Sequence, residues 1–400
     1  MFFAFGNATQ TRLANGTFMN AFLPRAYKYL FNRIGGSYVS KSLVEPLPIM
    51  GTLGHLKRFQ GSMTAQSIPT WLQNVPNNLY KTVAELDRSA PELDQTRQIM
   101  RIANDAGIRI GQHPDLLTVY RIMNGSAANS QYEVADNGTK YTITMDGLPF
   151  FSASHQTDGK TNQSNIVQGG LPATVNGYQA LDEASKAKIM LNDMGTVVQA
   201  FKTFKDNTGA PIFPTLDSKT SLVVLTPSLL ETVSAQVFAT PGGVIDMTTG
   251  IGHRFVKEVI STGYLDGSVN PNDSSPAAGG VSPLNPTDYY VAVVDDVVKP
   301  LYYQIYEPPT PSETLPFGNS ISQARDEVMR LAAVGGITLG ATEATIAAAA
   351  IVDTTFARVG AQADAYTILN EKYLVSPRVR DNVSYGPWFT MIRVKANGGN

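Results

Sequence analysis

Residues 181–235 decide the fold, and they read LDEASKAKIMLNDMGTVVQAFKTFKDNTGAPIFPTLDSKTSLVVLTPSLLETVSA. The first half of this stretch predicts a helix that ends in the Lys-Asp-Asn-Thr-Gly turn at 205–209. A short apolar run, Ser221–Leu225, has the composition of a buried strand. A second helix is expected to begin directly after Thr226 and Pro227. The stretch therefore predicts a helix, a turn, a strand and a helix, in that order.

The composition indicates a folded protein with an unusually uncharged surface. The chain has 400 residues, 43% of them hydrophobic, so we expect two or three packed units. Charged residues make up 16%, against about 25% in an average protein, and uncharged polar residues, Gly and Pro replace them. Because covering a charge costs desolvation, such a surface suits a protein that contacts copies of itself. A secreted Asn- and Thr-rich protein is the alternative.

Several classes of function are disfavoured by the same totals. The net charge of −2 creates no global positive field for nucleic acid. The absence of cysteine excludes disulfides, thiolate metal sites and a cysteine nucleophile. The first residues make a poor signal peptide, and the longest apolar stretch, Ala344–Val352, is too short to span a bilayer. We therefore expect no membrane contact and synthesis in a reducing cytosol.

Residues 1–45 are expected to form an arm. Leu23, Tyr27, Leu30 and Phe31 fall at helical spacing within an aromatic and basic segment that has no core of its own. Such a segment needs a partner surface. The alternative is an ordinary first helix packed on its own domain.

Residues 46–88 are expected to form a long two-stranded loop. Extended pieces near 53–59 and 79–86 flank a polar tip at 60–67. Because a long hairpin is only marginally stable alone, it should rest on a neighbour. A compact β-rich subdomain is the alternative.

Residues 92–124 carry the strongest helical period in the chain. Pro114 interrupts it, since proline lacks an amide donor and clashes with the preceding turn. Either the helix kinks there or a second helix begins at Pro114. Asn124 and Gly125 provide the C-terminal stop.

No motif predicts catalysis, and we expect no catalytic residue, cofactor or metal ion. The four histidines lack the spacing that places two imidazoles on one helical face. Ser152, Ser154, His155 and Asp158 lie close in sequence, but no nucleophile elbow surrounds either serine. A polar turn after a strand is the favoured interpretation. A serine hydrolase using Ser152 or Ser154 with His155 is the alternative.

Five short segments, taken in their order along the chain, resemble a known family of proteins. They are His113–Gly125, Pro149–His155, Phe204–Gly209 with Leu222–Glu231, Lys299–Gln304 and Tyr385–Phe389. Together they resemble the major head subunits of Mu-like tailed phages, over residues 80–310 and again over 366–390. Each match is short, and their common order carries the resemblance.

The resemblance implies an α+β fold of the Hong Kong 97-like phage capsid type. It implies an N-terminal arm at 1–45, an extended β-hairpin loop at 46–88, a peripheral domain with a long spine helix at 89–180, an axial domain at 181–295, a return strand at 296–307 and a C-terminal peripheral segment at 366–400. Residues 308–365 exceed the family pattern and are expected to be an insertion. The arm is not clearly matched.

The function implied by the resemblance is that of a major capsid protein of a tailed double-stranded DNA bacteriophage. Such a subunit is made in the bacterial cytoplasm and assembles into hexamers and pentamers of an icosahedral shell. Its expected partners are other copies of itself, a portal protein, scaffold and decoration proteins, and enclosed DNA through non-specific contact. The expected inter-subunit contacts are Tyr27, Phe31, His55, Lys57, Arg58 and Trp71. No covalent cross-link is predicted, and a serine hydrolase or a secreted binding module are the alternatives.

Overall fold

The structure of this protein is a computed structural model. It describes residues 21, 30–51, 68–81, 84–87, 98–157, 161–214, 216, 221–239, 256–269, 280–281, 285–294, 298–306, 372–375 and 378–398. The expectations for Tyr27, His55, Lys57 and Arg58 lie outside these residues, as do those for the insertion 308–365.

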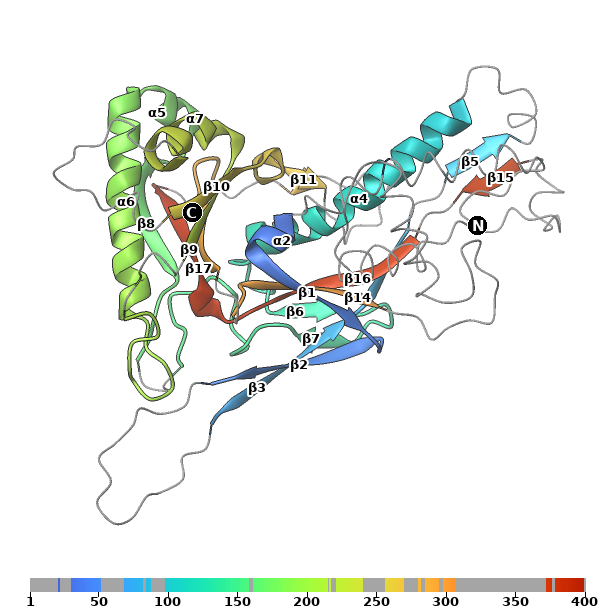
Figure 1. Cartoon of the computed structure of the whole chain (residues 1–400), viewed down its shortest axis with the longest axis horizontal. Helices are drawn as coiled ribbons and strands as arrows, with labels where there is room; N and C mark the ends of the chain where they lie inside the picture. The colour runs from blue at the N-terminus through green and yellow to red at the C-terminus, as the bar shows by residue number, and fades with distance from the viewer. Residues whose placement is uncertain are drawn as a thin grey trace, which may run out of the picture.

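A five-stranded mixed sheet carries the unit predicted from residues 181–235 (Figure 1). Its order is β10-β9-β13-β17-β8, with β8 at Ile166–Pro172, β9 at Ser221–Thr226, β10 at Val256–Ser261, β13 at Tyr289–Val294 and β17 at Met391–Asn397. β13 runs antiparallel to β9 and β17, whereas the pairs β10–β9 and β17–β8 are parallel. Strands β8 and β17 come from outside 181–295, so this sheet draws on more of the chain than the expected axial domain.

Helix α6 (Glu183–Thr203) packs along β8 at one flank of this sheet (Figure 1). Its first turn is capped by Asp182, whose Oδ1 accepts from the Ser185 amide at 2.6 Å. The chain then turns at Gly209, whose φ of +83° suits glycine. The shorter helices of this unit are α5 (Val175–Gln179), η1 (Ser228–Leu230), α7 (Glu231–Ser234), the π-turn η2 (Ala235–Ala239) and η3 (Gly263–Asp266). The predicted order of helix, turn, strand and helix is confirmed.

A second sheet, of four strands, has the order β1-β14-β16-β4. Its strands are β1 (Gly35–Ser40), β4 (Asn78–Lys81), β14 (Leu301–Tyr306) and β16 (Arg378–Tyr385). β1 runs parallel to β14, and the other pairs are antiparallel. Four two-stranded pairs complete the described strands: β2 (Val44–Met50) with β3 (Thr70–Pro76), β5 (Ala84–Asp87) with β15 (Lys372–Val375), β6 (Tyr132–Val134) with β7 (Lys140–Thr142), and β11 (Ser268–Val269) with β12 (Gly280–Val281).

The long helix α4 (Gln98–Asn124) packs against β16 and runs through Pro114. No second helix starts at Pro114. The proline removes one amide donor, but the helix continues, and the Thr118 hydroxyl donates to the Pro114 carbonyl at 2.8 Å. Downstream of the proline, Leu117 and Ile122 are fully buried, so packing holds the helix where local propensity opposes it.

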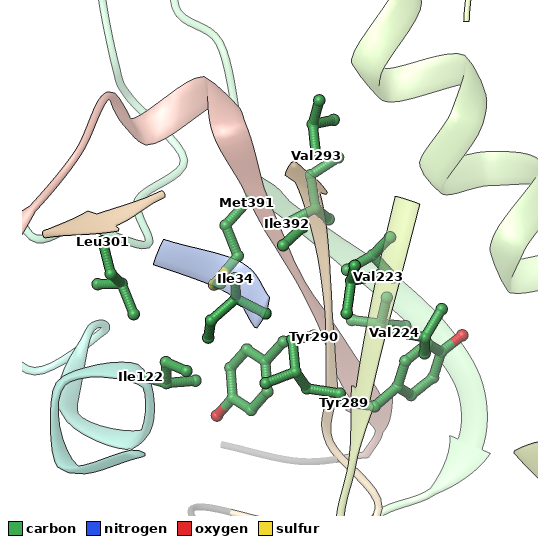
Figure 2. Close-up of a cluster of buried hydrophobic side chains, with 14 of the residues drawn as sticks. Ile34, Ile122, Val223, Val224, Tyr289, Tyr290, Val293, Leu301, Met391 and Ile392 are labelled. Carbon is green, nitrogen blue, oxygen red and sulfur yellow. The ribbon is translucent and has the colours of Figure 1, made fainter. Parts of the chain in front are cut away.

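The two sheets meet around α2 (Leu30–Ile34), which contacts α4, β13 and β14. Figure 2 shows Ile34 beside Ile122, Tyr290, Leu301 and Met391. These side chains are all buried. The residues of α2 and β1 therefore belong to the body, which favours the alternative of an ordinary first helix for this part of the expected arm.

One of the expected hairpin strands needs correction. An antiparallel pair is formed by β2 and β3, at 44–50 and 70–76, whereas the strand expected at 53–59 lies outside the described residues. Within 79–86, strands β4 and β5 pair instead with β16 and β15. Strand β2 contains Pro46 and Pro48, which an edge strand tolerates where the amide position of the proline faces away from the partner strand.

The described residues combine helices with sheets in which most neighbouring strands are antiparallel, so the α+β class is confirmed. Among the residues that the structure describes, no helix is both long and apolar enough to cross a membrane.

Candidate assembly surface

Strands β2 and β3 leave the body as a two-stranded ribbon with two unlike faces (Figure 1). Residues paired directly across an antiparallel ladder share a face. Ile49 pairs with Trp71 and Pro48 with Leu72, so these two pairs lie on opposite faces. The face with Ile49 is called the inner face here, and the face with Leu72 the outer face.

The inner face packs against the chain's own core. Ile49 and Val75 are buried, and Leu47 and Trp71 are partly buried against the main hydrophobic cluster. This contact fixes the orientation of the ribbon, because slipping the register by one residue would turn the inner side chains outward.

Buried side-chain amides hold the base of the ribbon to the four-stranded sheet. Gln304 Nε2 donates to the Val75 carbonyl at 3.1 Å and to Asn77 Oδ1 at 2.9 Å. Asn382 Nδ2 donates to the Pro76 carbonyl at 2.6 Å. Because these groups are buried, each bond left unmade would cost the desolvation of its partner. The ribbon is therefore firmly attached where it begins.

The outer face is apolar and exposed. It is formed by Pro46, Pro48, Met50, Thr70, Leu72 and Asn74, none of which is charged. Met50 is 69% exposed and Leu72 59%, and the flanking Leu43 and Ile68 are 54% and 40% exposed. Nearby, β6 contacts β3 and exposes Tyr132 and Val134. Among the described residues, Val175 is the one further large hydrophobic side chain that is exposed. Such a concentration of apolar surface marks a contact site.

Of the residues that the sequence predicts at contacts between copies, the structure describes Trp71 and Phe31. Trp71 lies on the inner face and is partly buried against the chain's own core. Phe31 is 1% exposed and lies 4.6 Å from the ring of Tyr303, so its side chain has a structural role. Met50 and Leu72, which the structure exposes, were not among the contact residues expected from the sequence. Their signal was the period-two pattern around them, which proline obscured.

A partly buried carboxylate, that of Asp115, joins α4 to the start of α2. Its Oδ1 accepts from the Leu30 amide at 2.7 Å, so it caps the first turn of that helix. Burial raises the pKa of Asp115 to about 7, while the amides of Leu30 and Phe31 and the charge of Arg33 oppose that rise. Arg33 also pairs with Glu258 on β10. The segment before β1 is therefore held by α4 and by the five-stranded sheet.

A buried ion pair joins α4 to β6, the strand that exposes Tyr132 and Val134. Arg121 Nη2 lies 2.6 Å from Glu133 Oε2, and both side chains are about 5% exposed. The same guanidinium donates to Asn382 Oδ1 at 2.8 Å and to the Val383 carbonyl at 2.9 Å. Glu133 raises the pKa of Arg121 further above its ordinary value, against the effect of burial. The pair joins α4, β6 and β16.

The serine hydrolase alternative is contradicted by the geometry around His155. Its Nδ1 lies 2.6 Å from Asp146 Oδ2, and its Nε2 lies 3.1 Å from the Phe150 carbonyl. The hydroxyls of Ser152 and Ser154 bond to each other at 3.2 Å. Both ring nitrogens therefore have partners other than a serine, and a nucleophile–base pair is not formed. His155 is fully buried, so it acts as a packed core histidine.

Metal chemistry finds no support in the part of the chain that the structure describes. No group of three or more His, Asp or Glu side chains there could hold an ion. The described residues instead form a projecting ribbon, β2–β3, and buried polar contacts such as the Arg121–Glu133 ion pair.

The chain matches no protein-family model, and no curated protein matches it. Among solved structures it is similar to a chain of the mature capsid of bacteriophage PhiM1, at 9% identity and a TM-score of 0.49, covering 92% of this chain and 87% of that one. It is similar to a capsid chain of cyanophage P-SCSP1u, at 8% identity and 0.48, covering 90% and 86%. A third is the capsid of bacteriophage JBD30 decorated with minor capsid protein trimers, at 14% identity and 0.43, covering 59% and 90%. At these identities and scores, what this chain does must be inferred from its own residues.

Proposed function

We propose that this protein is the major capsid subunit of a tailed double-stranded DNA bacteriophage, with a Hong Kong 97-like fold. The observation that carries the proposal is the β2–β3 ribbon, whose base is fixed by buried amides and whose outer face is apolar and uncovered by the described residues. A subunit that works alone has no use for such a ribbon. A subunit of a shell uses it to add contact area on neighbouring copies.

The architecture supports this function in a second way. The four-stranded sheet with α4 corresponds to the peripheral domain of the proposed fold, and the five-stranded sheet with α6 to the axial domain. Helix, turn, strand and helix follow each other in the second unit as the resemblance to Mu-like head subunits implies. Membership of that subfamily is part of the proposal and rests on the short motifs.

The proposed subunit forms hexamers and pentamers through heterologous contacts that close into rings, and these rings tile an icosahedral shell. Many weak contacts then sum to a stable lattice. Its further partners are a portal protein, scaffold and decoration proteins, and enclosed DNA. The work of such a protein is done by binding free energy, and no covalent step is needed.

Assembly tests the proposal directly. The full chain is expressed in bacteria, purified, and studied by sedimentation velocity and negative-stain electron microscopy across a range of protein concentrations. We expect rings or closed shells, alone or on addition of a scaffold protein. A species that remains monomeric up to high concentration under both conditions would contradict the proposed function.

A further inference from the structure

Four asparagine–glycine pairs lie within the described residues, and they differ in how firmly the fold holds them. In such a pair the backbone nitrogen of the glycine can attack the side-chain carbonyl of the asparagine, because glycine has no Cβ to obstruct the approach. The attack needs the peptide between the two residues to turn. A pair whose backbone is fixed by a helix, a sheet or close packing therefore reacts only when that part of the fold opens.

The pair at the end of α4 is held by packing. The side-chain Nδ2 of Asn124 donates to the Tyr120 carbonyl at 3.0 Å, which keeps the side chain on the last turn of the helix. Gly125 is buried, and a Cβ built on it would lie 2.7 Å from the ring of Phe151. The backbone has no room to turn at this pair.

Backbone hydrogen bonds hold two further pairs. In α5 the carbonyl of Asn176 accepts from the Ala180 amide at 3.0 Å. In β17 the carbonyl of Asn397 accepts from the Ala173 amide at 3.1 Å. Both asparagines are exposed, but the peptide that follows each of them is fixed in a helix or at a sheet.

The fourth pair, Asn137 and Gly138, lies at the exposed tip of the hairpin that β6 and β7 form (Figure 1). Residues 136–138 make a short loop in which Gly138 has a φ of +80°. Among the described residues, no backbone amide donates to the Asn137 carbonyl. The Gly138 amide donates to the Ala135 carbonyl at 2.8 Å, and this bond has to open before the nitrogen can attack. Opening one bond at an exposed loop tip costs little.

The side chain of Asn137 is already folded toward that nitrogen. Its Oδ1 accepts from the Thr139 amide at 3.0 Å. A side-chain oxygen that bonds to the amide two residues ahead brings its carbonyl carbon close to the intervening peptide, which here contains the Gly138 nitrogen. The bond from Thr139 also draws electrons toward Oδ1, so the carbon is more open to attack.

We infer that Asn137 is a site of spontaneous deamidation in the folded chain. The Gly138 nitrogen forms a bond to Asn137 Cγ, and Nδ2 leaves as ammonia together with the proton of the attacking nitrogen. Water then opens the cyclic imide at one of its C–N bonds. The products are aspartate and isoaspartate at position 137, which gains a negative charge beside Asp136, whose carboxylate lies 3.8 Å from Arg380.

Ageing of the purified full chain tests the inference. The folded subunit and the same chain unfolded in urea are incubated at mildly alkaline pH, and tandem mass spectrometry of proteolytic fragments follows the conversion of each asparagine–glycine pair. Asn137→Asp supplies the reference fragment for the aspartate product. Asn137→Gln is the matched control, because its longer amide side chain has to close a larger ring, which forms more slowly.

We expect Asn137 in the folded chain to convert at least about tenfold faster than the asparagines of the three held pairs, and the rates to converge in urea. Asn137→Gln should show no conversion at this position. If Asn137 converts in urea but is no faster than the held pairs in the folded chain, the inference is overturned. The result does not depend on whether the subunits assemble, so the proposed function stands or falls separately.

Discussion

The four-stranded sheet and the β2–β3 ribbon differ in whether their side chains find partners within the same chain. In and around the sheet, buried polar groups such as Gln304, Asn382 and Arg121 have specific partners. On the outer face of the ribbon, large apolar groups such as Met50 and Leu72 are exposed. The comparison teaches that these polar groups of the sheet find their partners within one chain, whereas the apolar groups on the outer face of the ribbon stay exposed in it.

The largest effect is expected from breaking the buried ion pair in the complete region. Arg121→Met leaves Glu133 charged and buried, and should lower the free energy of unfolding of the subunit by about 3–5 kcal/mol. Urea denaturation of dissociated subunits measures it. The matched control is Arg109→Met on the same helix, whose exposed pair with Asp105 should contribute less than about 1 kcal/mol. Equal effects of the two changes would contradict the expectation that the buried pair contributes more to stability than the exposed pair.

The second effect concerns how the folding stability of the subunit depends on pH. Because the pKa of Asp115 is raised from 3.8 to about 7 in the folded chain, the folded state holds this proton more tightly than the unfolded state. The stability that the protonated group confers is fully present below pH 4 and is lost as pH rises through 7. The loss is at most roughly 1.4 kcal/mol per pH unit in that window.

Asp115→Asn keeps an oxygen that can accept from the Leu30 amide but removes the titration. We therefore expect this variant to gain stability relative to the wild type as pH rises from 4 to 7, and to hold a constant advantage above pH 7. Urea denaturation at a series of pH values measures the difference. Parallel pH profiles for the two proteins would show that Asp115 is not held as the structure indicates.

A smaller effect is expected at the base of the ribbon. Gln304→Leu leaves the Val75 carbonyl and Asn77 Oδ1 without this donor, and should cost about 1–3 kcal/mol of unfolding free energy. Gln156→Leu, at an exposed site, is the control and should change little. If the two variants unfold at the same urea concentration, the amide contacts do not hold the ribbon.

The smallest effect on folding should come from the exposed face itself. Met50→Lys is expected to change subunit stability by less than about 0.5 kcal/mol, because the side chain is 69% exposed in the single chain. The same variant should impair assembly. A large loss of subunit stability would show that Met50 belongs to the intramolecular core, and would remove the distinction between the two regions.

The order of elements could be predicted from sequence wherever hydrophobic period and turn residues agree. The helix at 183–203, the strand at 221–226 and the long helix ending at Asn124 are examples. Pro114 left two alternatives open, because propensity alone cannot tell whether the packing of Leu117 and Ile122 outweighs one lost hydrogen bond.

The sequence predicted that a projecting hairpin would form a contact surface, but it did not predict which residues are exposed on it. The sequence indicated a projecting hairpin, yet the strand expected at 79–86 pairs elsewhere, since pairing joins segments that lie far apart in the sequence. Long-range partners such as Gln304 for Val75 leave no local pattern either. Phe31 and Trp71 were expected at contacts because they fall in the arm and the loop that the sequence predicts, whereas both side chains pack on the chain's own core.

The position of β17 has a consequence for the timing of synthesis. Residues 391–397 fill the slot between β13 and β8, so the five-stranded sheet stays open until the ribosome has passed them. Parallel pairing of β1 with β14 likewise waits for residues about 265 positions downstream. A nascent polypeptide therefore cannot complete the four-stranded sheet before residue 385 has been made, or the five-stranded sheet before residue 397.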